Sequence, residues 1–152
     1  MNLLRIVLAM TFCAATLPGC TKYKMTVPDG FRQYQDSGEF KMITADGVML
    51  KGREVDNYPK ADLPFWTDAL KRHMRERGYE FKSVDCFKTK SGLDGCALEF
   101  MLPNAGEDWV LSECMFVIDD RIILLESAGP YARYAKVEKS LHEAYRTFIP
   151  NP

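Results

Sequence analysis

The chain lacks the features that mark nucleic-acid binding or membrane spanning. Its 20 basic and 21 acidic side chains leave a formal net charge of -1 over 152 residues. Domains that bind nucleic acid usually carry a clear excess of positive charge, so we expect no nucleic-acid partner. The one long apolar run, at residues 6–17, falls short of the roughly 20 residues that a transmembrane helix needs.

Composition and length are those of an ordinary folded domain. Hydrophobic residues make up 47% of the chain, charged residues 27% and aromatic residues 12%. This composition excludes intrinsic disorder and a multi-pass membrane protein. At about 150 residues per domain, the length predicts a single domain.

The N-terminus has the features of an export signal. Arg5 is the only charged side chain before the uncharged run at residues 6–17, whose length suits a signal-peptide core. The run ends in Leu17-Pro18-Gly19-Cys20. This segment resembles the lipobox of bacterial lipoproteins, in which a leucine and a small residue precede a cysteine. The resemblance implies cleavage after Gly19 and lipidation of Cys20; plain secretion with a chance cysteine, or a buried N-terminal helix, are the alternatives.

These boundaries divide the chain into three parts. We expect a signal peptide over residues 1–19, a lipidated N-terminus and short tether over residues 20–23, and one α+β domain over residues 24–152. Even seven fully extended residues span only roughly 23 Å at about 3.3 Å each, so the domain would lie close to the bilayer. The membrane would then be one partner, through the lipid on Cys20, and an unidentified envelope protein the other.

The residue after the cysteine bears on localisation. Thr21 rather than aspartate follows Cys20, which in enterobacterial sorting resembles an outer-membrane destination. We therefore expect an exported protein on the periplasmic face of the outer membrane, or on the outer face of the cytoplasmic membrane, depending on the type of envelope.

Three cysteines would remain after processing, because Cys13 leaves with the signal peptide and Cys20 carries lipid. Cys86 and Cys96 flank a predicted hairpin turn, and at a non-hydrogen-bonded position their Cα atoms would lie about 4.5 Å apart, within disulfide range. Cys114 falls in an apolar strand and is interpreted as a buried small hydrophobe. Three free thiols are the alternative, and a metal or redox site lacks the usual closely spaced ligands.

Apolar periodicity and turn residues predict two helices and six or seven strands. Asp62 can cap a first helix, which Gly78 ends. A second helix is predicted over residues 131–148, with its apolar stripe at Tyr134, Val137, Leu141, Tyr145 and Phe148. Strands are predicted over residues 23–27, 39–45, 48–55, 79–87, 96–101, 109–118 and 121–127.

Two tight turns set the expected strand pairing. Asp46-Gly47 is a strong hairpin signal, and a two-residue turn there would put Ile43 opposite Leu50 and Ala45 opposite Val48 on one face. Residues 119–120, both aspartates, form the turn between the last two strands.

Because hairpins between successive strands dominate, we predict an α+β fold. It would consist of a mainly antiparallel sheet of six or seven strands with two helices packed on it, an α/β sandwich. The order of elements resembles the PsbP-like fold, which is named for an extrinsic photosystem II protein and shared with bacterial relatives. The resemblance rests on element order and transfers no functional residue.

No catalytic set of residues stands out. The only histidines, His73 and His142, fall on predicted helices, where we interpret them as partly buried or surface residues rather than bases or ligands. Paired acidic residues at 107–108 and 119–120 fall in turns, where carboxylates accept bonds from backbone donors. Ser127 lies at a strand-to-helix junction but lacks the G-x-S-x-G frame. The sequence therefore predicts no enzyme, no metal site and no cofactor.

Aromatic residues outside clear core patterns are the remaining candidates for a binding surface, since tyrosine and tryptophan are enriched at interfaces. They are Phe31, Tyr34, Tyr58, Trp109 and Tyr131. The alternative is that they cap the ends of the sandwich. From these observations we expect a non-catalytic, membrane-anchored envelope lipoprotein that acts through protein contact. The second hypothesis is a small-ligand-binding module with a cleft between sheet and helix.

Overall fold

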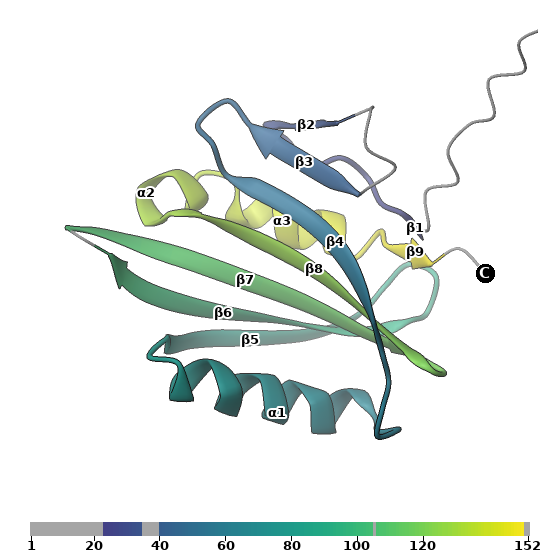
Figure 1. Ribbon diagram of the computed structural model, residues 1–152. Helices are drawn as coiled ribbons and strands as arrows, with labels where there is room; N and C mark the ends of the chain where they lie inside the picture. Colours follow the sequence, from purple (N-terminus) through teal and green to yellow (C-terminus); the bar gives the residue numbers. More distant parts are fainter. Residues whose placement is uncertain (1–22, 35–39, 105, 151–152) are drawn as a thin grey trace, which may run out of the picture.

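The computed structural model describes residues 23–34, 40–104 and 106–150 (Figure 1). Gly19, Cys20 and the predicted signal peptide lie outside these residues. In chain order the elements are β1 (Tyr23–Lys24), β2 (Phe31–Gln33), β3 (Lys41–Thr44), β4 (Met49–Asp56), α1 (Leu63–Glu76), β5 (Glu80–Lys88), β6 (Asp94–Asn104), β7 (Glu107–Ile118), β8 (Arg121–Pro130), α2 (Tyr131–Tyr134), α3 (Glu138–Tyr145) and β9 (Ile149–Pro150).

A seven-stranded sheet forms the centre of the fold. Its strands run in the order β2-β3-β4-β8-β7-β6-β5, and every neighbouring pair is antiparallel. Figure 1 shows α1 on one face of this sheet, and α2 with α3 on the other. The predicted α+β class, with a mainly antiparallel sheet covered by helices, is confirmed.

Each face of the sheet carries its own apolar layer. On the α2–α3 side, the fully buried Tyr145 and Phe148 pack with side chains from β3, β4, β6, β7 and β8. On the α1 side, Met74 packs with Leu98 and Phe100 of β6. Because both faces are covered, the central strands are apolar along most of their length, as their sequence indicated.

Helix α1 begins and ends at the predicted residues. The Asp62 side chain accepts a hydrogen bond of 3.0 Å from the backbone N–H of Phe65, which caps the helix. After the helix, Gly78 has a φ of 88°, a left-handed conformation that glycine adopts without strain. Leu63, Leu70 and Met74 face the sheet. The apolar side of the amphipathic helix is therefore the side that packs on the sheet.

The predicted register of the β3–β4 hairpin is wrong by one residue. Met42, not Ile43, lies opposite Leu50, and Ile43 lies opposite Met49. The reason is the turn: the N–H of Thr44 bonds to the carbonyl of Val48, and Gly47 has a φ of 86°, so the loop has three residues rather than two. A one-residue shift exchanges the two faces, so Met42 and Leu50 are the buried residues.

The predicted second helix is interrupted. Residues 135–137 form a turn between α2 and α3, and the helix ends at Tyr145 rather than Phe148. The apolar stripe still packs on the sheet, because all its members belong to the same core cluster. Periodicity predicted the buried side chains but could not show the turn.

The two ends of the described chain lie side by side. Tyr23 of β1 pairs with Pro150 of β9, and Lys24 pairs with Ile149. Neither β9 nor β2 was predicted, and the expected strand at residues 23–27 is only two residues long. Strands this short have too few residues to show an alternating pattern.

Candidate functional site

A row of polar side chains crosses the sheet beneath α2 and α3. Ser83 lies opposite Glu99, Glu99 opposite Ser112, and Ser112 opposite Ser127, on four neighbouring strands. Glu99, Ser112 and Ser127 are all buried. A buried polar row in an otherwise apolar layer needs partners for its polar atoms, and Glu99 has several.

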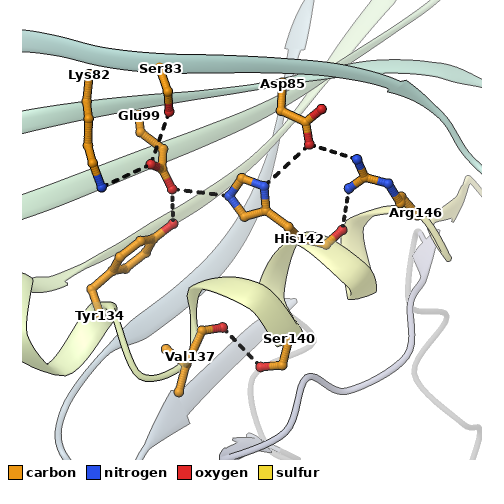
Figure 2. A network of polar contacts seen from close by, with 9 residues as sticks. All are labelled: Lys82, Ser83, Asp85, Glu99, Tyr134, Val137, Ser140, His142 and Arg146. Carbon is orange, nitrogen blue, oxygen red and sulfur yellow. Dashed lines mark hydrogen bonds and ion pairs between the residues drawn. The ribbon is translucent and has the colours of Figure 1, made fainter.

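Glu99 is the centre of a network of polar contacts (Figure 2). Its Oε1 atom accepts a hydrogen bond of 2.9 Å from the Tyr134 hydroxyl and lies 3.1 Å from Nε2 of His142. Its Oε2 atom accepts a bond of 3.2 Å from the Ser83 hydroxyl and lies 3.5 Å from Nζ of Lys82. Burial opposes ionisation of Glu99, but the bonds from His142 and Tyr134 and the charge of Lys82 lower its pKa to about 2.

His142, on α3, lies between two carboxylates. Besides Glu99, its Nδ1 atom lies 3.6 Å from Oδ2 of Asp85. The bond to Glu99 raises the pKa of His142 against the opposing effect of burial, and Asp85 adds to the increase. The network therefore favours the imidazolium form.

Arg146 completes the network, as Figure 2 shows. One guanidinium nitrogen lies 2.8 Å from Oδ2 of Asp85, and another donates 3.0 Å to the backbone carbonyl of His142. Burial opposes ionisation of Asp85, but the Arg146 contact lowers its pKa. An open surface hollow of about 380 Å³ adjoins Asp85, His142 and Arg146.

The geometry indicates a structural role for the network. An imidazolium between two carboxylates has no free lone pair with which to accept a proton. The hydroxyls of Ser83 and Tyr134 both donate to Glu99, and burial raises the pKa of Tyr134. The contacts join α2 and α3 to strands β5 and β6.

The convergence of His142 with two carboxylates was missed from the sequence. The sequence predicts His142 as a partly buried or surface helix residue, and it gives no pattern that joins Glu99 or Asp85 to it. Glu99 is a lone acid within an apolar strand, and that was the available signal, since carboxylates are rarely buried without a partner. His73, in contrast, is exposed on α1, on the other face of the sheet.

A second pair of carboxylates lies on the α1 face of the sheet. Glu113 and Glu126 are opposite each other on β7 and β8. Nζ of Lys51 and Nε of Arg53 lie 3.0 and 2.7 Å from the Glu126 carboxylate. Burial and the neighbouring Glu126 charge raise the pKa of Glu113, whereas contacts with Arg53 and Lys51 lower that of Glu126 against the effect of burial. Glu113 therefore acts as the neutral member of the pair.

An open groove of about 1170 Å³ separates the start of α1 from the ends of β5 and β6. Apolar side chains such as Leu63, Val84 and Leu93 line it, and so does the disulfide between Cys86 and Cys96. The two cysteines are directly opposite each other, with their Cα atoms 4.0 Å apart. The disulfide considered from the sequence is thus present in the structure, and Cys114 is a buried free cysteine.

The five predicted aromatic residues do not form one surface. Phe31 is fully buried in the core, which corrects its assignment to a binding surface; as the first residue of β2, it pairs with Thr44 and faces inward. Tyr58 is 86% exposed and follows Asn57, which bonds to the β7–β8 turn. Trp109 pairs with Pro130 at the other end of that ladder, roughly 30 Å away at about 3.3 Å per residue.

The remaining two aromatic residues are exposed at separate places. Tyr34 follows β2 and has Nζ of Lys41 6.0 Å from its ring centre. Tyr131 begins α2, next to Pro130 and so near Trp109, and Nζ of Lys82 lies 5.2 Å from its ring centre. Of the five, Trp109 lines a small hollow of about 210 Å³.

Over residues 23–34, 40–104 and 106–150, no cluster of three or more histidine, cysteine or acidic side chains could hold a metal ion. Within the same ranges, no helix has the length and apolar character needed to cross a bilayer.

Comparison with known proteins identifies the fold. No protein-family model and no curated protein sequence matches the chain. Its structure is similar to LpqN, which is involved in cell envelope biogenesis of Mycobacterium tuberculosis, with a TM-score of 0.66 and 11% identity over 91% of this chain and 88% of that chain. It is also similar to cyanobacterial PsbP (CyanoP) from Synechocystis, with a TM-score of 0.57 and 14% identity over 86% and 88% of the two chains.

A third similar structure is PA94 from Pseudomonas aeruginosa, a protein of unknown function described as a putative regulator. Its TM-score is 0.55 and its identity 16%, over 83% of this chain and 90% of that chain. At these identities the similarity concerns the fold and carries over no site residue. The PsbP-like order of elements predicted from the sequence is supported.

Proposed function

We propose that this chain is a lipid-anchored envelope protein that acts through protein contact and not through catalysis. The observation that carries the proposal is the position of the lipobox-like segment. Cys20 precedes Tyr23, the first residue of β1, by only three residues. An anchor on Cys20 would therefore hold this fold directly against a membrane. LpqN, whose fold is similar, is involved in cell envelope biogenesis, which agrees with an envelope role.

The polar network supports the non-catalytic part of the proposal. His142 is the histidine that carboxylates approach, but Glu99 and Asp85 contact both of its ring nitrogens. A general base needs a free nitrogen within reach of substrate. The Cys86–Cys96 disulfide agrees with the oxidising compartment that export implies.

Protein contact would use the end of the sandwich that bears Trp109 and Tyr131. Trp109 is seven residues along β7 from Phe116, whose ring stacks at 4.3 Å on Phe148 beside β9, so the two ends lie roughly 23 Å apart. An anchor ahead of β1 leaves the Trp109 end facing away from the bilayer. Exposed or half-buried aromatic rings there suit a protein partner.

The anchor is tested by the intact mass of the protein extracted from its native membranes. We expect a mass equal to residues 20–152 plus lipid, with a gain of two hydrogens on reduction. A Cys20→Ala variant should be unlipidated, and Cys114→Ala is a matched control that changes a buried cysteine outside the signal. An unlipidated wild-type chain in the soluble fraction would overturn the proposal.

The contact surface is tested by photo-crosslinking in cells. A benzophenone amino acid at Tyr131 should crosslink to a defined partner, whereas the same group at Tyr34, which is exposed just after β2, is the control for random collision. Equal crosslinking from both positions would argue against contact at the Trp109 end.

A second candidate function is the binding of a small ligand in the groove beside the disulfide. The groove lies between sheet and helix, as that hypothesis requires, and its volume of about 1170 Å³ is slightly above the roughly 300–1,000 Å³ that is usual for ligand sites. Phe87 is its aromatic lining residue, not the aromatics predicted from the sequence. Native mass spectrometry of protein from its host would detect a retained ligand. A Leu93→Trp substitution, which places a larger side chain in the groove, should reduce retention, and Leu102→Trp in the small hollow beside Trp109 should not.

A further inference from the structure

One end of the molecule combines lysines with exposed apolar side chains. Lys24 and Ile149 lie opposite each other in the β1–β9 pair. Because Tyr23 points into the core, its neighbour Lys24 points outward, and Ile149 beside it is 48% exposed. An exposed isoleucine next to a lysine, on a two-residue strand, is not required by the packing of the core.

Two further residues extend this surface. Val27 is 40% exposed and lines the same hollow as Lys90 and Thr147. Two bonds join the hollow to the segment between α3 and β9. The N–H of Thr26 bonds to Oγ1 of Thr147 at 2.9 Å, and the N–H of Lys90 bonds to the carbonyl of Arg146 at 2.8 Å. We refer to Lys24, Val27, Lys90 and Ile149 as the terminal surface.

The positions of nearby acidic side chains show which lysine supplies most of the positive charge of the terminal surface. Asp29 and Glu143 line the hollow that contains Lys90, so the charge of Lys90 is partly balanced. Lys24 lies instead on the β1–β9 pair, opposite an apolar residue. Lys24 is therefore the main cation of the surface, and Val27 and Ile149 are its apolar part.

The length of the tether decides what this surface faces. From Cys20 to Tyr23 there are three residue steps, which span at most about 11 Å when fully extended. The headgroup layer of one leaflet is roughly 5–7 Å thick, from a total thickness of about 40–45 Å and a hydrocarbon core of about 30 Å. A lipid on Cys20 thus leaves no room for more than a thin layer between β1 and the headgroups.

We propose that the terminal surface rests on the phospholipid headgroups of the leaflet that holds the anchor. Lys24 would face lipid phosphates, and Val27 and Ile149 would contact the boundary between headgroups and acyl chains. Lysine and apolar side chains commonly take these positions at a membrane surface. The inference rests on the proposed lipid anchor. It adds a fixed orientation, in which the β1–β9 end faces the bilayer and the start of β7 lies at the opposite end (Figure 1).

The test uses the lipid-modified protein from its host, reconstituted in vesicles of phosphatidylethanolamine and phosphatidylglycerol at a ratio of 3:1. A membrane-impermeant acetylating reagent labels exposed lysines, and mass spectrometry gives the labelling rate at each one. We expect Lys24 and Lys90 to react at least threefold more slowly in vesicles than in nonionic detergent. Lys136 and Lys139, which are exposed before and on α3, should react equally in both.

A pair of double variants separates the surface from general effects. In Lys24→Glu/Ile149→Ser, labelling of Lys90 in vesicles should rise at least twofold. The matched control is Arg72→Glu/Val84→Ser, which changes one exposed cation and one exposed apolar residue elsewhere and should leave Lys90 protected. Unchanged rates at Lys136 and Lys139 in both variants would show that the fold is intact.

The outcomes distinguish the two proposals. Equal labelling of Lys24 and Lys90 in vesicles and detergent, with lipid present on Cys20, would overturn the orientation and leave the anchor standing. An intact mass without lipid, and no cosedimentation with the vesicles, would overturn both.

Discussion

Nε2 of His142 lies 3.1 Å from Oε1 of Glu99, and Glu99 is only 1% exposed. The two residues are 43 positions apart in the chain, one on α3 and the other in the middle of β6. Their contact fastens the C-terminal helix to the sheet through a pair of charges. The stability of the fold should therefore depend on the protonation state of both residues.

His142 should make the protein less stable at alkaline pH. Its folded-state pKa lies above the ordinary value of 6.5. The resulting stabilisation is fully present below about pH 6.5 and is lost as the pH rises through the folded-state pKa. Urea unfolding at pH 6 and pH 9 should show a decrease that is much smaller in His142→Gln. His73→Gln, on the exposed side of α1, should retain the wild-type decrease; a pH response that survives in His142→Gln would contradict the assignment.

Glu99 should determine how the free energy of unfolding changes at acid pH. A lowering of its pKa from 4.5 to about 2 corresponds to about 3 kcal/mol at roughly 1.4 kcal/mol per unit. This contribution is present above pH 4.5 and is lost as the pH falls towards 2. Glu99→Gln should destabilise the protein by about 3 kcal/mol at pH 6. It should also reduce the loss of stability as the pH falls below 4.5. Glu76→Gln, at the exposed end of α1, should change neither quantity.

Tyr134→Phe tests one bond of the network in isolation. The substitution removes the hydroxyl that donates to Glu99 and keeps the ring in the core, so we expect a loss of about 1.5–3 kcal/mol, the range for a hydrogen bond to a charged group. The midpoint of thermal unfolding measures the effect. Tyr131→Phe is the matched control, because Tyr131 is exposed at the start of the same helix. Equal midpoints for the two variants would argue against the Tyr134 bond.

Loss of the disulfide should weaken the hairpin formed by β5 and β6. The bridge closes a short loop between Cys86 and Cys96, so Cys86→Ser/Cys96→Ala should lower the free energy of unfolding by about 2–3 kcal/mol. Reduction of the wild-type protein should lower it by a similar amount. Exchange of the β5 amide hydrogens should accelerate more than that of β8, and a uniform increase across the sheet would contradict a local effect.

The sequence predicted the main sheet well where a turn residue or an apolar pattern was explicit. The turn at Asp119 was placed correctly, with a φ of 51° that aspartate tolerates, and Gly78 ended α1 as expected. The β3–β4 register was missed because Asp46-Gly47 fits both two-residue and three-residue loops. Local sequence does not choose between them.

The candidate site was largely beyond the reach of sequence patterns. Asp85, Glu99 and His142 come from three elements, and their proximity depends on the order of strands and the docking of α3. Phe31 was mistaken for a surface residue because β2 has only three residues. Glu99 shows what could have been noticed, since a single acid in an apolar strand must find partners.

The sheet also determines which cysteines can pair. Cys96 packs on the α1 side with Met74, whereas Cys114, its near neighbour on β7, packs on the α3 side. Once β6 and β7 have joined, the backbone of the sheet separates their sulfur atoms, and Cys114 is closed off from solvent. A wrong pairing with Cys114 could form only in a chain that is oxidised before it folds. The order of two events, strand pairing first and oxidation second, would be enough to select the correct bridge without an enzyme to reshuffle it.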